Sequence, residues 1–177
     1  MHKRTFITIA ALSLLICGTA RPAEWQHLVI LHTNDIHGHL PQEEAWWLNP
    51  NFPPPIGNAA AVATIIKEER RMAEQKGWGF LLVEGGDIFQ GTPLGEFTKG
   101  QAVIDFMNMM GYDAMTIGNH DYDKGQEVLK SLIASAKFPV LGANLIDSIS
   151  GKTAEHLKPY VIVERAIKGM LPKTKLG

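Results

Sequence analysis

The chain has 177 residues and a mass of 19.5 kDa, and 45% of its residues are hydrophobic while 20% are charged. This composition is typical of one globular domain and excludes a disordered chain, a collagen-like chain and a polytopic membrane protein. The formal net charge of -1 excludes a broad basic surface, so a nucleic acid polymer is not an expected partner. A small phosphorylated ligand remains possible, because a few local groups or a metal ion can bind it.

The beginning of the chain has the features of a secretory signal peptide. Basic residues at 2–4 precede an apolar run at 6–17, which is too short to span a bilayer comfortably, and the small residues that follow predict cleavage after Ala20. The single cysteine, Cys17, lies within this segment, so the mature chain would contain no disulfide. We therefore expect removal of residues 1–20 and export to a periplasm or the cell surface, without a stable membrane anchor. An uncleaved anchor and a lipid on Cys17 are the alternatives.

Apolar and amphipathic runs alternate along the remaining chain, which predicts an α/β fold. Residues 27–31 form an aliphatic run suited to a strand that is buried on both faces, and the polar loop 33–40 follows. Residues 46–55 contain two tryptophans and four prolines and predict a surface loop, because proline removes an amide donor and fixes φ. We expect the aromatic side chains of this loop to pack onto their own domain rather than against a ligand.

A long amphipathic helix is predicted next. Asn58 is suited to begin it, Lys76 lies near its end, and Gly77 is suited to terminate it. Its expected apolar stripe consists of Ala59, Val62, Ile65, Ile66 and Met72. The later predicted elements are, in order, a strand at 80–83, a tight turn at 85–87, a helix at 101–110, a strand at 114–117, a helix at 126–136 and strands at 139–141 and 160–163.

Polar side chains follow three of the predicted strands, at the point where each strand ends. Asp35 and His37 follow the first strand, Asp87 follows the second, and Asn119 and His120 follow the third. Open α/β sheets gather ligand groups at this edge, so we expect the three loops to lie together. Two carboxylates, two imidazoles and one carboxamide suit Mn, Fe, Zn or Mg better than a soft metal.

Each of these groups alone also has a structural explanation. Asp35 and His37 fit a turn carboxylate beside a surface histidine, and Asp87 fits a turn cap after paired glycines. An Asn-His pair can simply satisfy backbone groups. The occurrence of all three at equivalent strand ends favours a metal site over coincidence.

Three sequence blocks resemble the calcineurin-like metallophosphoesterases. They are LHTNDIHG at 31–38, GDIFQGTP at 86–93 and GNHDYD at 118–123. The blocks are most similar to the exported 5'-nucleotidase branch, which includes UDP-sugar hydrolases and 2',3'-cyclic-nucleotide phosphodiesterases. The resemblance extends from about residue 27 to residue 163. It implies a four-layer αββα sandwich with two mixed sheets, of which this chain would hold the first half.

The same resemblance implies two divalent metal ions, of Zn, Mn, Fe, Mg or Co, and a small-molecule nucleotide or phosphate-ester substrate. Carried over residue by residue, it makes Asp35 and His37 ligands of one ion, Asp87 the bridge between both, and Asn119 a ligand of the second. His120 would be the catalytic histidine, and Asp123 would orient it and keep it protonated. Two such ions can activate a shared water for in-line attack on phosphate, while the imidazolium stabilises the developing charge.

The chain departs from the family pattern in two respects. GNAAA at 57–61 lacks the arginine that relatives usually carry at the start of the first helix, which affects local helix contacts. Relatives also continue into a second half with further histidine ligands and a separate nucleoside-binding domain. We therefore expect residues 21–177 to be the N-terminal part of a longer catalytic domain, truncated here and nearly inactive alone.

Two classes of function remain open. The first is an exported hydrolase that releases phosphate from nucleotides, with a cyclic-nucleotide phosphodiesterase and a thiosulfate-ester hydrolase as further alternatives. The second is a degenerate, non-catalytic module that keeps the fold and binds one cation or a partner. Residues His32, His39 and His156 receive no role in either, and we expect them to make loop or supporting hydrogen bonds.

Overall fold

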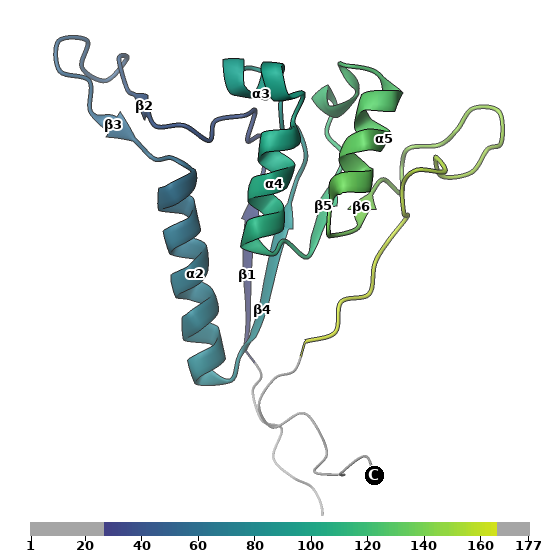
Figure 1. Ribbon diagram of the computed structural model, residues 1–177. Coiled ribbons are helices and arrows are strands. Elements are labelled where there is room, and N and C mark those ends of the chain that lie inside the picture. Colours follow the sequence, from purple (N-terminus) through teal and green to yellow (C-terminus); the bar gives the residue numbers. More distant parts are fainter. Residues whose placement is uncertain (1–26, 166–177) are drawn as a thin grey trace, which may run out of the picture.

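The computed structural model describes residues 27–165, which form a four-stranded parallel sheet with helices on one face (Figure 1). The strands, in their order across the sheet, are β1 (Leu28–Thr33), β4 (Gly79–Glu84), β5 (Ala114–Thr116) and β6 (Val140–Leu141). The connecting helices are α2 (Ala59–Lys76), α4 (Gln101–Met110) and α5 (Gln126–Ser135). The predicted α/β class is confirmed, while the predicted signal peptide lies outside the described residues.

Parallel pairing aligns the carboxyl ends of the three strands that carry the predicted site. Thr33 pairs with Glu84 across β1 and β4, and Glu84 pairs with Met115 across β4 and β5. Each strand therefore stops at about the same level. The loops that follow emerge side by side at one edge of the sheet, as the sequence predicts.

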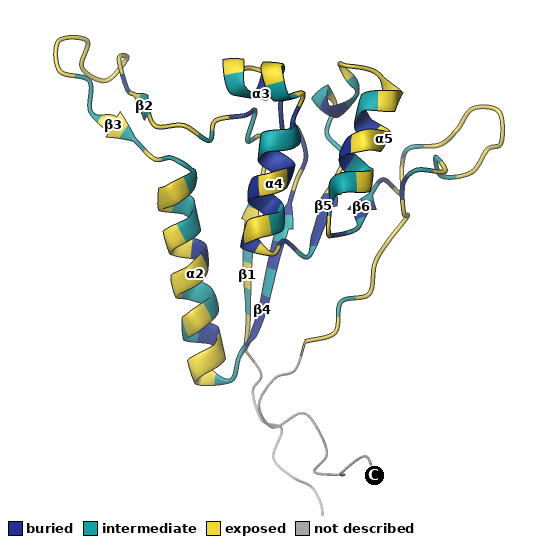
Figure 2. Ribbon diagram, viewed as in Figure 1, coloured by how far each residue is buried: buried dark blue, intermediate teal, exposed yellow. Residues whose placement is uncertain are grey.

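The core lies between the sheet and the helix layer. Figure 2 shows buried residues along α4 and β4, and β4 is buried along most of its length. Fully buried members of this core include Leu82, Phe89, Ile104 and Met107. Each such side chain stabilises the fold by about 1.5 to 3 kcal/mol through removal of apolar surface from water.

The limits of α2 follow from its caps, and they match the sequence prediction. The Asn58 side chain accepts a hydrogen bond of 2.9 Å from the Ala61 amide. Gly77, at φ 68, ends the helix in the left-handed conformation that glycine adopts without strain. Of the predicted apolar stripe, Ile66 is buried, but Ile65 is 56% exposed and its assignment to the core was wrong.

The sheet face opposite the helices is apolar and open. Leu28 and Ile30 of β1 are 49% and 56% exposed, and Leu81 and Val83 of β4 are half-buried. Residues 27–165 thus form one helix layer and one sheet layer, which is half of a four-layer arrangement. Within the same range, no helix combines the length and the apolar character needed to cross a membrane.

The predicted fifth strand, 160–163, was wrong. This segment has no strand structure, and Tyr160 and Ile162 are 70% and 79% exposed. The backbone pairs with the sheet just before this segment, where Lys158 forms a bridge with Leu141. Within the described chain, residues 159–165 make no backbone hydrogen bond to β6 beyond those of Lys158. The structure also contains the short helices α3 (Pro93–Thr98) and η1 (His120–Tyr122), which the sequence analysis did not predict.

The proline-rich loop projects from the domain instead of packing onto it. Strands β2 (Glu43–Glu44) and β3 (Pro55–Ile56) pair in an antiparallel hairpin that carries the loop outward (Figure 1, upper left). Trp46, Trp47 and Phe52 are 57%, 75% and 81% exposed. The expected packing of these aromatic side chains was therefore wrong.

Candidate metal centre

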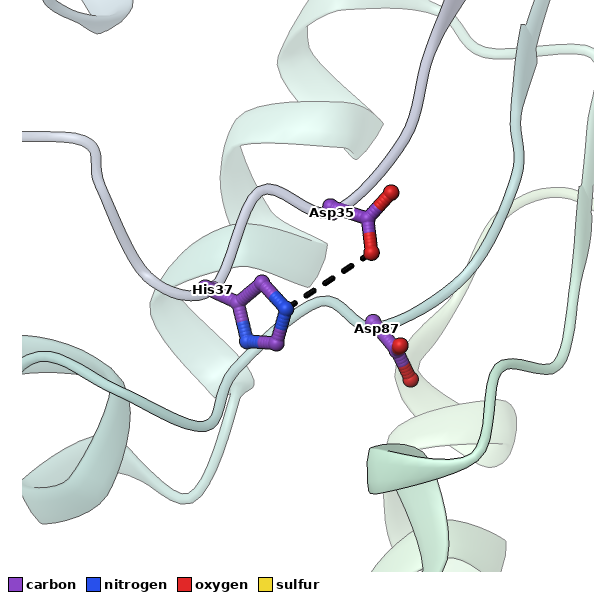
Figure 3. A group of neighbouring side chains, drawn as sticks. All are labelled: Asp35, His37 and Asp87. Atoms are coloured by element: carbon purple, nitrogen blue, oxygen red, sulfur yellow. Dashed lines mark ion pairs between the residues drawn. The ribbon is translucent and has the colours of Figure 1, made fainter.

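Three predicted ligands converge at the carboxyl edge of the sheet (Figure 3). Asp35 and His37 come from the loop after β1, and Asp87 comes from the loop after β4. Each offers one ligand atom, and these atoms all lie within 4.8 Å of one another. The cluster thus joins two loops that are about fifty residues apart in sequence.

Main-chain hydrogen bonds hold the two loops together beyond the ends of the strands. The amides of Asp35 and His37 donate to the carbonyls of Gly86 and Asp87, each at 3.0 Å. The Gly38 amide continues this series with a bond of 2.9 Å to the Ile88 carbonyl. The parallel pairing of β1 and β4 therefore extends into the site and fixes the relative position of its ligands.

Backbone strain is concentrated at the same three residues. Asp35, His37 and Asp87 have φ angles of 54°, 47° and 60°, in the left-handed region that L residues seldom adopt. Lys99 is the other non-glycine residue of the described range with a positive φ. Each such conformation costs about 1 to 3 kcal/mol, which is a common feature of functional sites.

The orientation of the His37 ring suits metal binding. Its Nδ1 faces the carbonyl of Gln90, which can only accept, so Nδ1 carries a proton and the neutral form of the ring offers its lone pair at Nε2. That Nε2 lies 3.7 Å from Oδ1 of Asp35. Two acceptor atoms facing each other at this distance are stabilised by a cation between them, so the donor set fits a divalent ion.

Asp87 lies at the centre of the site. The residue is 8% exposed, and its Oδ1 accepts a hydrogen bond of 2.7 Å from the amide of His120. This bond joins the loop after β4 to the loop after β5. Its position between the two loops gives Asp87 contact with both sides of the site.

The His120 side chain forms a pair with Asp123 beside this cluster. His120 Nδ1 lies 2.7 Å from Asp123 Oδ2, and this hydrogen bond is the main reason that the pKa of His120 is raised. The imidazole ring lies 5.5 Å from the ring of His37, centroid to centroid. Asn119 precedes His120 and has an exposed side chain, and the main-chain contact with Asp87 is made by the amide of His120.

Sequence reasoning missed two buried carboxylates behind the site. Glu84 and Asp121 are 2% and 1% exposed. Glu84 accepts the amide of Gly86 at 3.2 Å and the hydroxyl of Thr33, while burial raises its pKa to about 7. The signal available in the sequence was a glutamate directly following the apolar run 80–83.

A short chain of hydroxyl groups supports Glu84. Thr33 donates to this carboxylate, so its oxygen accepts from the Tyr112 hydroxyl, which lies 2.8 Å away. Burial raises the pKa of Tyr112 to about 12, so its proton is retained at neutral pH. These contacts connect the ends of β1 and β4 with Tyr112, which lies two residues before β5.

Two of the histidines without an assigned role make supporting contacts, as expected. His39 pairs with Glu43, and His156 lies 2.9 Å from the Tyr122 hydroxyl. His32 is exposed on the open face of the sheet. A groove of about 820 Å³, lined in part by Lys130 and His156, contains none of the predicted site residues.

The parallel sheet and the donor set at its carboxyl edge define a metal-binding α/β domain. Comparison with known families then identifies it more closely, because the model of the calcineurin-like phosphoesterase family matches residues 28–159. The chain belongs to this family, whose members use divalent metal ions.

The similar proteins are considerably longer than this chain. A 5'-nucleotidase of Bos taurus is 37% identical over 161 residues, which are 89% of this chain and 27% of the relative. A 5'-nucleotidase of Vibrio cholerae is 36% identical over 158 residues, which are 86% of this chain and 27% of the relative. The chain therefore spans about a quarter of the length of these relatives.

Solved structures agree with this relationship. A 5'-nucleotidase precursor of Thermus thermophilus superposes with a TM-score of 0.63 at 30% identity, over 77% of this chain and 26% of that one. The sulfate thiohydrolase SoxB of Thermus thermophilus gives a TM-score of 0.66 at 18% identity, over 76% of this chain and 33% of that one. At that identity, the likeness to SoxB shows the fold alone.

Proposed function

We propose that residues 21–177 form the N-terminal part of a metallophosphoesterase domain that hydrolyses phosphate esters of nucleotides. The observation that carries this proposal is the convergence of Asp35, His37 and Asp87 within 4.8 Å, beside the His120–Asp123 pair. The 5'-nucleotidase relatives support a nucleotide as the substrate class.

The proposed ligand set follows the strand ends. Asp35 and His37 would hold one divalent ion, Asn119 would hold the second, and Asp87 would contribute to both. When bound, such a pair supplies a metal-activated water and neutralises the phosphate oxygens. The lone pair of His37 at Nε2 and the central position of Asp87 support these assignments.

His120 and Asp123 have complementary roles in this proposal. Asp123 accepts from Nδ1 of His120 and raises the pKa of the imidazole, so the ring retains its second proton at Nε2 to a higher pH. Nε2 then donates a hydrogen bond to a phosphoryl oxygen or to the departing alkoxide. Asp123 holds the ring in the orientation that this requires.

The test combines metal content with hydrolysis. The 177-residue chain is loaded with Mn2+ or Zn2+ and assayed on AMP, UDP-glucose, a 2',3'-cyclic nucleotide and an aryl phosphate. We expect metal binding and only slow release of phosphate, because the chain spans about a quarter of its relatives. In a longer protein with the downstream histidines, His120→Ala lowers turnover of AMP by about a hundredfold or more. A chain that binds no divalent ion would refute the proposal.

The same assay separates the hydrolase from a degenerate module. If the longer protein binds one ion and turns over none of the four substrates, it is a binding module. Sequencing the gene beyond Gly177 gives an independent answer, since a downstream Gly-His-x-His segment would supply the missing ligands of the hydrolase.

We also propose that residues 1–20 direct export of the protein. The basic start and the apolar run support this assignment. N-terminal sequencing of the exported chain should begin at Arg21, and a chain that begins at Met1 in the same fraction would contradict cleavage.

A further inference from the structure

Asp121 is more buried than any other acidic side chain in residues 27–165, and the proposed ligand set gives it no role. It is 1% exposed, compared with 2% for Glu84 and 8% for Asp87. A carboxylate is stable at such a position only when its oxygens are matched by donors. The hydrogen-bond donors around Asp121 therefore indicate its role.

Three main-chain amides donate to Asp121. Its Oδ2 accepts from Asp87 at 3.0 Å and from Gly118 at 2.8 Å, and its Oδ1 accepts from Ile88 at 3.0 Å. Two of these amides belong to the loop after β4 and one to the loop after β5. One side chain thus joins the two loops through their backbones.

The two amides from the first loop lie on either side of the Asp87 α-carbon. The amide of Asp87 belongs to the peptide plane before that carbon, and the amide of Ile88 belongs to the plane after it. Fixing both planes against one carboxylate fixes φ and ψ of Asp87. This explains how Asp87 is held at φ 60°, which costs about 1 to 3 kcal/mol without compensation.

Two residues just before Asp121, Gly118 and His120, position the side chain of Asp87. The amide of His120, one residue earlier, donates to Asp87 Oδ1 at 2.7 Å. A Cβ at Gly118 would lie 2.2 Å from that same oxygen, so glycine allows this close approach. The block 118–121 therefore holds both the backbone and one oxygen of Asp87, and leaves the second oxygen for a metal ion.

We propose that Asp121 is a positioning residue for the metal centre. It holds Asp87 in a strained backbone conformation before any ion binds, so that binding does not need to order this ligand. The proposal rests on the proposed function for the role of Asp87 as a metal ligand. The holding of the Asp87 backbone itself is a property of the metal-free chain.

The first test is the affinity of the 177-residue chain for Mn2+, measured by calorimetry and corrected for the folded fraction. In Asp121→Asn, the amide group faces at least one main-chain N–H, so Asp87 loses part of its support. We expect affinity to fall by about 10 to 100-fold, as for other residues that orient ligands. Asp105→Asn, which makes the same change on the exposed face of α4, is the matched control and should keep wild-type affinity.

Glu84→Gln, compared with wild type at pH 8, where most of the Glu84 carboxyl group is ionised, separates positioning from charge. Like Asp121→Asn, it removes one buried acidic group near the site, but it keeps an acceptor oxygen for the Gly86 amide. We expect a clearly smaller loss of affinity in Glu84→Gln. Equal losses in the two variants, or wild-type affinity in Asp121→Asn, would overturn the proposal.

Hydrogen exchange on the metal-free wild type gives a second test that needs no variant. The amides of Asp87, Ile88 and Gly118 lie in loops, yet they should exchange as slowly as amides within β4. Fast exchange at the three positions would overturn the proposal even if Asp121→Asn does not fold. Slow exchange in a chain that fails to bind Mn2+ would support the holding of Asp87 and reject the proposed function instead.

Discussion

Burial of Glu84 makes the stability of the metal-free chain depend on pH. The pKa of this carboxyl group is raised from its ordinary value of 4.5 to about 7, chiefly because burial penalises the charged form. Between these two values, the folded chain keeps a proton that the unfolded chain has released. The resulting contribution to stability is complete below pH 4.5 and is lost as the pH rises through about 7.

The size of the effect follows from the two pKa values. Their difference of about 2.5, at about 1.4 kcal/mol for each pKa unit, corresponds to about 3 kcal/mol. Glu84→Gln removes the titrating carboxyl group and keeps an oxygen for the Gly86 amide. The unfolding free energy of this variant should therefore lack the pH dependence that Glu84 causes.

The assay is urea unfolding, followed by circular dichroism in EDTA, at several pH values from 4 to 8. The difference in unfolding free energy between wild type and Glu84→Gln should change by about 3 kcal/mol across this range, with the wild type losing stability as pH rises. Glu68→Gln, at an exposed position on α2, is the matched control and should follow the wild type. Parallel profiles for wild type and Glu84→Gln would refute the reasoning.

Three further predictions concern the site itself. Gly118→Ala places a Cβ against Asp87 and should weaken Mn2+ binding at least tenfold. Gly57→Ala, whose new Cβ has no atom within 4 Å, is the control and should bind Mn2+ like the wild type. Equal affinities in the two variants would contradict the close packing of Gly118 against Asp87. Asp123→Asn should lower the pKa of His120 in an NMR titration, since the hydrogen bond to Asp123 raises it, and an unchanged pKa would contradict the pairing. Metal at a hundredfold excess over its Kd should add about 2.7 kcal/mol to the unfolding free energy of the wild type. This stabilisation should be lost in Asp35→Asn, and a variant that keeps all of it would exclude Asp35 as a ligand.

The elements that lie at the centre of the sheet could be predicted from local sequence. The run 80–83 and the helix Gln101–Met110 are nearly all apolar on the buried side, and their limits are set by flanking glycines and polar residues. Burial and pattern agree at these positions, so a single sequence is sufficient. The helix over Ala59–Lys76 was equally predictable, because Asn58 and Gly77 cap it by local hydrogen bonds.

The errors occur where the outcome depends on contacts that the sequence does not specify locally. Residues 160–163 have the composition of a strand, but a strand also requires a neighbouring edge, and the pairing ends at Lys158. The tryptophans at 46 and 47 are hydrophobic, yet the β2–β3 hairpin carries them away from the core. Hydrophobic residues are not always buried, so composition alone could not settle either case.

The candidate metal ligands could be predicted from the sequence, but the residues that hold them in place could not. Asp35, His37 and Asp87 were identified because they follow predicted strands, and the structure brings them together. The prediction that residues 27–31 are buried on both faces was wrong, since Leu28 and Ile30 are exposed. The role of Asp121 depends on three amides from distant loops, and no sequence pattern states where those amides point. The same holds for Glu84, whose partner Thr33 becomes its neighbour only through the parallel pairing of β1 and β4.

The most direct test of the metal centre is anomalous diffraction from crystals of the chain grown with Mn2+. We expect a peak about 2.0 to 2.3 Å from Nε2 of His37 and from one carboxylate oxygen each of Asp35 and Asp87. A second peak beside Asp87 and Asn119 would complete the proposed pair. Full occupancy by Mn2+ elsewhere on the chain, with no density among these three side chains, would contradict the central claim.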